Sequence, residues 1–112
     1  MLLLSGQLVM ANHSMHPLKQ IAFVKKMIER QQEPYRTAYV QLIHYADSIQ
    51  LVTHHARNDF AVPGYYVKPK EHRANSLALQ QDAFAAYCSA LAYRLSGKKH
   101  YGEKACYFMN AW

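Results

Sequence analysis

Four segments of the chain repeat apolar residues at intervals of three and four, and this periodicity constrains the fold more than any other feature of the sequence. Such spacing places the apolar side chains on one face of an α-helix. We expect helices over Leu18–Gln32, from Pro34 to about Thr53, over Ser76–Ser96 and over Lys99–Trp112. The sequence therefore predicts an all-α fold built from antiparallel helix pairs.

The last two expected helices should form a hairpin. Only the short turn 96–99 separates them, and Gly97 supplies a residue that tolerates the left-handed conformation of a helix stop. The apolar faces expected to pack comprise Leu77, Phe84, Cys88, Leu91 and Leu95 on the first helix, and Tyr101, Ala105, Phe108 and Trp112 on the second.

Composition indicates one folded domain with a basic surface. The chain has 112 residues, of which 51% are hydrophobic and 18% charged, which is too apolar for a disordered chain. Its formal net charge of +6 favours a polyanionic partner, which includes nucleic acid, an acidic membrane surface and an acidic polysaccharide. No run approaches the roughly 18 apolar residues needed to span a bilayer, so we expect no membrane segment.

The two cysteines give no sign of a metal site. Cys88 and Cys106 belong to two neighbouring expected helices, without a CxxC pair or a His-x₃₋₅-His pattern nearby. We expect buried thiols rather than a disulfide, and neither a metal nor a cofactor.

Both ends of the sequence suggest that the chain is part of something longer. Residues 1–15 contain a short apolar stretch but no positively charged n-region, so we interpret them as a leader or linker, or as the remnant of a signal peptide. At the other end, the apolar stripe runs to Trp112 without a capping glycine, polar tail or proline. We expect a helical domain over residues 16–112 that is truncated at its C-terminus.

A long connection, His55–Asn75, separates the second and third expected helices. Pro63, Gly64 and Pro69 exclude a helix through its middle, and connections of this length are often lids or binding loops. Aromatic rings and cations together can stack on sugars and hold carboxylates, or stack on bases and hold phosphates. The alternative is that the tyrosines only fix the loop to the protein body while the lysines are solvated. The residues expected to contact a ligand are Tyr65, Tyr66, Lys68, Lys70, His72 and Arg73.

Several short motifs follow one another in a characteristic order from residue 16 to residue 112. They are His16-Pro17, Glu33-Pro-Tyr-Arg-Thr-Ala38, Ala46-Asp47, Val62-Pro-Gly-Tyr-Tyr66, His72-Arg73 with Leu79, Asp82-Ala83, Ala90-Leu-Ala-Tyr-Arg-Leu-Ser-Gly97, Tyr101-Gly-Glu-Lys-Ala105 and Asn110-Ala-Trp112. In their order and spacing they resemble the opening of an alginate lyase domain.

This resemblance implies the N-terminal part of an incomplete (α/α) toroid, with a cleft for an acidic polysaccharide and a lid loop between early helices. Residues 62–70 match that lid in position, and Tyr66 matches one of its aromatic residues. The implied reaction is β-elimination on alginate or a related polyuronate, by an enzyme that is periplasmic or secreted. Such a reaction requires a neutralised carboxylate, a base for the C5 proton and an acid for O4.

The catalytic residues of the family are not expected in this chain. In the family a histidine belongs to an Asn-Asn-His motif, and an arginine and a tyrosine follow further downstream. The sequence has no such motif, and Asn12-His13 does not match its position. We interpret His44, His54 and His55 as histidines on a helix face or at a helix end. The fragment is therefore expected to be inactive alone and to supply scaffold and lid.

Two other classes of function compete with this one. Small and aromatic residues between Ala86 and Ala105 resemble the packing of tetratricopeptide hairpins, which would make the chain a helical-repeat interaction module. Such arrays require self-similarity at about 34 residues, which the first two expected helices do not provide. A nucleic-acid binder is disfavoured because the cations are spread along the chain and no recognised binding motif is present.

Overall fold

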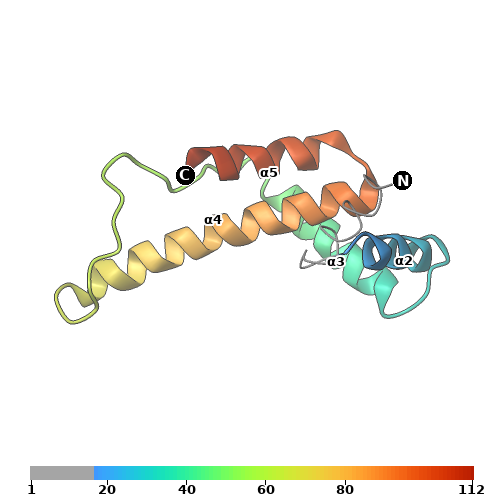
Figure 1. Ribbon diagram of the computed structural model, residues 1–112, viewed down its shortest axis with the longest axis horizontal. Helices are drawn as coiled ribbons and strands as arrows, with labels where there is room; N and C mark the ends of the chain where they lie inside the picture. Colours follow the sequence, from blue (N-terminus) through green and yellow to red (C-terminus); the bar gives the residue numbers. More distant parts are fainter. Residues whose placement is uncertain (1–16) are drawn as a thin grey trace, which may run out of the picture. The chain divides into compact units, whose positions relative to one another are not determined.

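A computed structural model describes residues 17–112 of the chain, and Figure 1 shows its secondary structure. The helices in this range are α2 (Leu18–Glu29), α3 (Tyr35–Ser48), α4 (Pro69–Ser96) and α5 (Lys99–Ala111). The described range contains no β-strand, so the predicted all-α class is confirmed. The predicted leader at 1–15, with Asn12-His13, and the motif residue His16 lie outside the described residues.

The chain divides into two compact units, Met1–Gln41 and Leu42–Trp112. The described part of the first unit contains α2 and the beginning of α3. Pro17 precedes the first turn of α2, where its missing N–H costs no helical hydrogen bond. The Phe23 ring meets the Tyr35 ring edge to face, with 5.8 Å between centroids. None of the side chains of α2 is buried.

The second unit is organised around the hairpin of α4 and α5, which lie side by side in Figure 1. Gly97 ends α4 with φ = 74°, a left-handed conformation that side chains with a Cβ rarely adopt. Its N–H donates a 2.8 Å hydrogen bond to the carbonyl of Tyr93. The chain then turns directly into α5, as the short connection predicts.

Small residues allow the helices of this unit to approach closely. One core cluster combines Ala46 at the end of α3 with Ala92 and Tyr101. The Tyr101 hydroxyl also donates a 2.6 Å hydrogen bond to Asp47 Oδ1. A second cluster combines Ile49, Ala85 and Phe108. The predicted stripe of α5 is confirmed for Tyr101, Ala105 and Phe108, which are all buried, whereas Trp112 is 46% exposed.

Three predicted helix boundaries are wrong. The helix α2 ends at Glu29 and not at Gln32. The helix α3 ends at Ser48 and not near Thr53. More importantly, α4 begins at Pro69, seven residues before the predicted start at Ser76. Proline disrupts a helix interior, but at the first helical position it removes only an N–H that would have no partner within the helix. Pro69 therefore starts α4, with Glu71 in the favourable first turn.

The predicted apolar face of α4 is also partly wrong. Cys88 and Leu95 are buried, but Leu77 and Phe84 are 54% and 55% exposed. These two side chains are exposed because α4 is longer than the helix that covers it. The helix α4 has 28 residues and α5 has 13. At a rise of about 1.5 Å per residue, α4 is about 22 Å longer than α5. Its first half therefore extends beyond the hairpin.

The cysteine prediction is correct in part. Both residues are free thiols, as expected, but only Cys88 is buried while Cys106 is exposed on α5. Burial raises the pKa of the Cys88 thiol, which keeps this side chain neutral in the core. None of the described helices is both long and apolar enough to cross a membrane.

Candidate functional site

The segment 49–68 connects α3 to α4, and we call it the connection. It passes the end of α5 and reaches the first residue of α4 at its far end (Figure 1). Side chains of α4 hold it at successive points: Asp82 binds His55, Asn75 binds Ala61 and His72 binds Pro63. As the residue numbers increase along the connection, the numbers of their partners on α4 decrease. The two segments therefore run antiparallel.

The beginning of the connection is attached to α5. Lys104 donates a 2.7 Å hydrogen bond from Nζ to the carbonyl of Val52. The backbone N–H of His54 donates to the Tyr107 hydroxyl at 3.1 Å, and the two rings lie 5.2 Å apart. These contacts fix the chain just after α3 has ended.

The side chain of Asp82 makes three polar contacts, although the residue is only 2% exposed. Its Oδ2 accepts hydrogen bonds from the backbone N–H of His55 at 2.7 Å and from Trp112 Nε1 at 3.0 Å. Its Oδ1 lies 2.6 Å from His55 Nδ1. One carboxylate thus joins α4, the connection and the last residue of the chain.

These hydrogen bonds decide the charge of Asp82. Burial alone would raise the pKa of this carboxyl, but the backbone N–H and ring of His55 and the indole of Trp112 outweigh it. The pKa of Asp82 is therefore lowered. Because an ionised carboxylate only accepts hydrogen bonds, the proton between the two side chains belongs to Nδ1 of His55.

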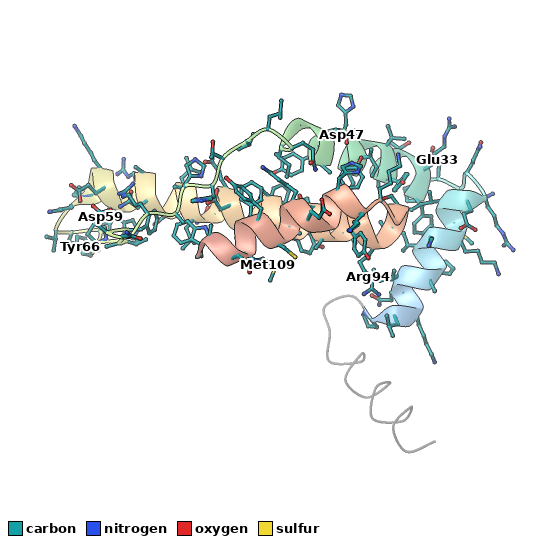
Figure 2. All side chains as sticks on the ribbon, turned by 90° about the horizontal axis from the view of Figure 1, so that it is seen from above. Glu33, Asp47, Asp59, Tyr66, Arg94 and Met109 are labelled. Carbon is teal, nitrogen blue, oxygen red and sulfur yellow. The ribbon has the colours of Figure 1, made fainter. Side chains whose placement is uncertain are left out.

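A tight turn, residues 64–68, forms the far end of the connection, and we call it the tip. The N–H groups of Val67 and Lys68 both donate 3.1 Å hydrogen bonds to the carbonyl of Gly64. Tyr66 is 96% exposed and Val67 is 78% exposed. Figure 2 shows Tyr66 at the end of the second unit that lies away from Arg94. Exposure this complete is unusual for a large aromatic side chain.

The neighbouring Tyr65 is fixed by two residues from the first turns of α4. Arg73 Nη2 donates a 3.0 Å hydrogen bond to the Tyr65 hydroxyl, and the guanidinium lies 5.6 Å from the ring centroid. The His72 ring meets Tyr65 edge to face, and its Nδ1 hydrogen bonds to the carbonyl of Pro63 at 2.8 Å. Tyr65 in turn supports Tyr66, with 5.5 Å between ring centroids.

The six residues predicted to contact a ligand gather at the beginning of α4. Tyr65, Tyr66 and Lys68 lie in the tip. Lys70, His72 and Arg73 lie on α4 and not in a loop, which corrects the predicted limits of the connection. All except His72 are exposed. Residues 65–73 hold one acidic side chain, Glu71, against Lys68, Lys70 and Arg73, so this segment carries a net positive charge. Glu71 Oε2 lies 3.8 Å from Lys68 Nζ.

A groove of about 590 Å³ opens beside Asp82, where the end of α3 faces α4. Two aromatic residues, Tyr45 and Phe84, lie in its wall with 5.2 Å between ring centroids. Gln80, Gln81 and His55 supply polar groups. Burial, followed by the nearby Cys88 thiol, raises the pKa of Tyr45, so its phenol stays protonated.

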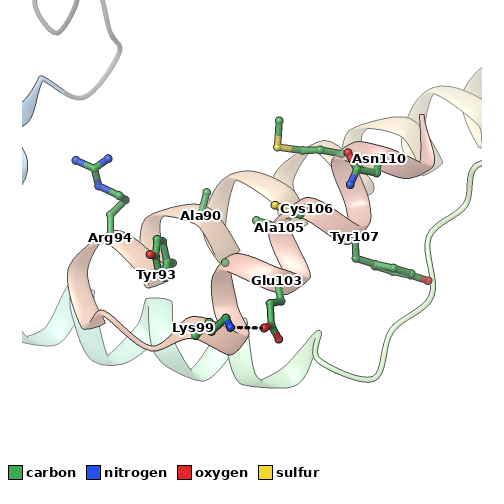
Figure 3. A pocket seen from close by; sticks show the side chains of 11 residues that line it. Ala90, Tyr93, Arg94, Lys99, Glu103, Ala105, Cys106, Tyr107 and Asn110 are labelled. Carbon is green, nitrogen blue, oxygen red and sulfur yellow. Dashed lines mark ion pairs between the residues drawn. The ribbon is translucent and has the colours of Figure 1, made fainter. Parts of the chain in front are cut away.

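A second groove of about 620 Å³ lies on the α4–α5 hairpin and is shown in Figure 3. Its lining is mainly apolar, with small residues such as Ala90, Gly102 and Cys106. A Cβ on Gly102 would come within 3.1 Å of the Tyr93 ring, so glycine allows that ring to lie flat against α5. One exposed ion pair, Lys99–Glu103 at 3.8 Å, lies at its edge.

The pair of His55 and Asp82 was missed by the sequence analysis. The sequence predicts that His55 lies on a helix face or at a helix end, but α3 ends seven residues earlier and the His55 ring binds Asp82. One signal was available: Asp82 falls three residues before Ala85, on the buried face of α4. A carboxylate at such a position requires hydrogen-bond donors. Within residues 17–112, no group of three or more His, Cys, Asp or Glu side chains is placed to hold a metal ion.

Comparison with protein-family models, with curated proteins and with solved structures gives no match to this chain in any of the three.

Proposed function

We propose that the chain is the N-terminal part of a polysaccharide lyase of the alginate lyase type, which cleaves alginate or a related polyuronate by β-elimination. This part contributes helical scaffold and the substrate-contacting tip. The proposal rests on the resemblance of the motifs from residue 16 to residue 112. The structural observation that supports it best is the tip itself, where Tyr66 is 96% exposed beside Lys68 and Arg73.

The chemistry of the tip suits an acidic sugar. An exposed aromatic ring offers a flat apolar face for the C–H face of a sugar, while neighbouring cations attract its carboxylate. The tyrosine beneath is already fixed by Arg73 and His72, so the platform is formed before a ligand arrives. A preformed platform reduces the entropy that binding costs.

Catalysis is assigned to another part of the protein. The elimination needs a base at C5, an acid at O4 and a group that neutralises the carboxylate. The family places these in an Asn-Asn-His motif and in a later arginine and tyrosine, which this sequence lacks. Under this proposal the full protein acts in the periplasm or outside the cell, where polymeric uronates occur.

Titration with an alginate oligomer tests the role of the tip. We expect Tyr66→Ala to weaken binding about fivefold to thirtyfold, as loss of a stacking contact of about 1–2 kcal/mol implies. Tyr66→Phe should keep most of the affinity because it keeps the ring. Affinity should also fall between low salt and about 0.2 M salt, because exposed cations are screened.

The control is Tyr93→Ala, which removes an exposed tyrosine far along α4. Equal weakening by Tyr66→Ala and Tyr93→Ala would refute the role of the tip, and so would an unchanged affinity of Tyr66→Ala. Circular dichroism of each variant verifies that the helices are intact.

The helical-repeat module remains the second candidate, and the apolar groove on the hairpin favours it. Repeat hairpins stack by such surfaces. However, α4 and α5 have 28 and 13 residues, whereas a 34-residue repeat holds two short helices of similar length. Reading the coding frame beyond Trp112 separates the two candidates: units that recur every 34 residues support the module, and an Asn-Asn-His motif supports the lyase.

A further inference from the structure

The side chain of His55 is oriented before any ligand is present. Its Nδ1 lies 2.6 Å from Asp82 Oδ1, and its own backbone N–H binds the other oxygen of the same carboxylate. Two hydrogen bonds from one residue to one carboxylate fix both the position and the ring plane. Since Nδ1 carries the shared proton, Nε2 is the ring nitrogen that a ligand can meet.

His55 is an exposed residue although its partner is buried. Its side chain is 43% exposed, against 2% for Asp82, and it lines the groove of about 590 Å³. His55 therefore places an oriented imidazole at the wall of an open groove. Trp112 also binds Asp82, at 3.0 Å, so the carboxylate would remain hydrogen bonded without the His55 ring.

The other groups in this groove are those that proteins use to bind sugars. Phe84 is 55% exposed and, with Tyr45, presents an aromatic surface. The exposed amides of Gln80 and Gln81 can both donate and accept hydrogen bonds. An aromatic wall with a few convergent polar groups is typical of small-ligand sites.

The groove lies on the same helix as Arg73, which binds the hydroxyl of Tyr65 in the tip. Gln80 follows Arg73 by seven residues, which is about two helical turns and about 10 Å along the axis. Residues at this spacing share one face of a helix. A single extended oligosaccharide can therefore reach both places.

We propose that this groove binds one uronate unit of the polymer whose neighbouring units contact the tip. Nε2 of His55 forms a hydrogen bond with a sugar hydroxyl, the amide of Gln81 donates to the carboxylate, and Phe84 supports the apolar face of the ring. This inference rests on the proposed function, because it takes the same acidic polymer as its ligand.

The test measures the dissociation constant of an alginate oligomer for Gln81→Ala and for His55→Ala. Each should raise the constant about fivefold to tenfold, as expected for the loss of one ligand hydrogen bond. Gln41→Ala is the matched control, because Gln41 is also exposed on a helix but lies outside the groove. Gln81→Ala removes no hydrogen bond of the fold that the structure records, so it stays informative if His55→Ala unfolds.

A carboxyl-reduced oligomer of the same length identifies the group that Gln81 binds. Wild-type protein should prefer the acidic oligomer, and this preference should shrink about threefold or more in Gln81→Ala but not in Gln41→Ala. An unchanged preference would refute the assigned carboxylate contact.

The outcomes separate this inference from the proposed function. Weakening by Tyr66→Ala but not by the groove variants overturns the groove and leaves the tip. Weakening by the groove variants but not by Tyr66→Ala supports the groove and overturns the tip. If the wild-type chain binds neither oligomer, both are overturned.

Discussion

The two halves of α4 are held by different kinds of interaction. From Ala85 to Ser96 the helix packs on α5 through buried small and apolar side chains. From Pro69 to Phe84 it is accompanied by the connection, which it binds through single hydrogen bonds at His72, Asn75 and Asp82. In this first half Leu77 and Phe84 are more than half exposed.

Because of this difference, we expect one half of α4 to determine stability and the other half to carry the residues that contact a ligand. Apolar burial is cooperative, so the packed half should determine the global free energy of unfolding. Individual hydrogen bonds each contribute about 1 kcal/mol net, so the connection should open locally at lower cost. Every residue that we assign to a ligand lies in or beside this less stable half.

The largest effect is expected in the packed half. Phe108 is 1% exposed and belongs to the cluster with Ile49 and Ala85. Phe108→Ala should lower the free energy of unfolding by about 4 kcal/mol, because it removes a buried ring and leaves a cavity. Urea unfolding measures the change. Met109→Ala is the control, since Met109 is 66% exposed, and comparable losses in the two variants would contradict the assigned core.

The next largest effect is expected at the junction of the two halves. Asp82→Ala removes the acceptor for three hydrogen bonds and should cost roughly 3 kcal/mol. Asp59→Ala is the matched control, because Asp59 is exposed and only pairs with Arg57. Similar stabilities of the two variants would show that Asp82 does not join the connection to the helices.

Acid provides an independent test of the same carboxylate. The pKa of Asp82 is lower in the folded protein than in the unfolded chain, so its contribution is complete above the ordinary carboxyl pKa of about 4. That contribution is lost as the pH falls through the lowered folded value. Stability should therefore decline less steeply in Asp82→Asn than in the wild type below about pH 4. Parallel declines would contradict the shift.

The smallest effect is expected within the connection. Asn75 Nδ2 donates a 2.6 Å hydrogen bond to the carbonyl of Ala61. Asn75→Ala should speed amide exchange in residues 56–63 about fivefold, as loss of about 1 kcal/mol of local stability implies, while exchange in α5 stays unchanged. Faster exchange throughout the second unit would show that the two halves unfold together.

The sequence predicted the parts of this molecule that depend on periodicity. The hairpin turn at Gly97 and the stripe of Tyr101, Ala105 and Phe108 follow from local spacing and glycine chemistry. The buried face of α4 could not be predicted from local spacing, because its burial depends on how far α5 extends beside it. Leu77 satisfies the helical period, yet lies beyond the end of its neighbour.

The candidate site also has one part that the sequence predicted and one part that it did not. The cationic and aromatic character of the tip is visible in the sequence from Tyr65 to Arg73. The pairing of His55 with Asp82 joins residues 27 positions apart, and no local pattern specifies it. Only the antiparallel course of the connection along α4 brings them together.

The central claim is that the tip recognises an acidic polysaccharide, and an NMR titration of the isotope-labelled chain with an alginate oligomer tests it most directly. The account predicts that the largest amide shifts occur at residues 64–68 and at Arg73, and that they diminish at high salt. Shifts confined to the hairpin groove around Ala90 and Gly102, or no shifts at all, would contradict it.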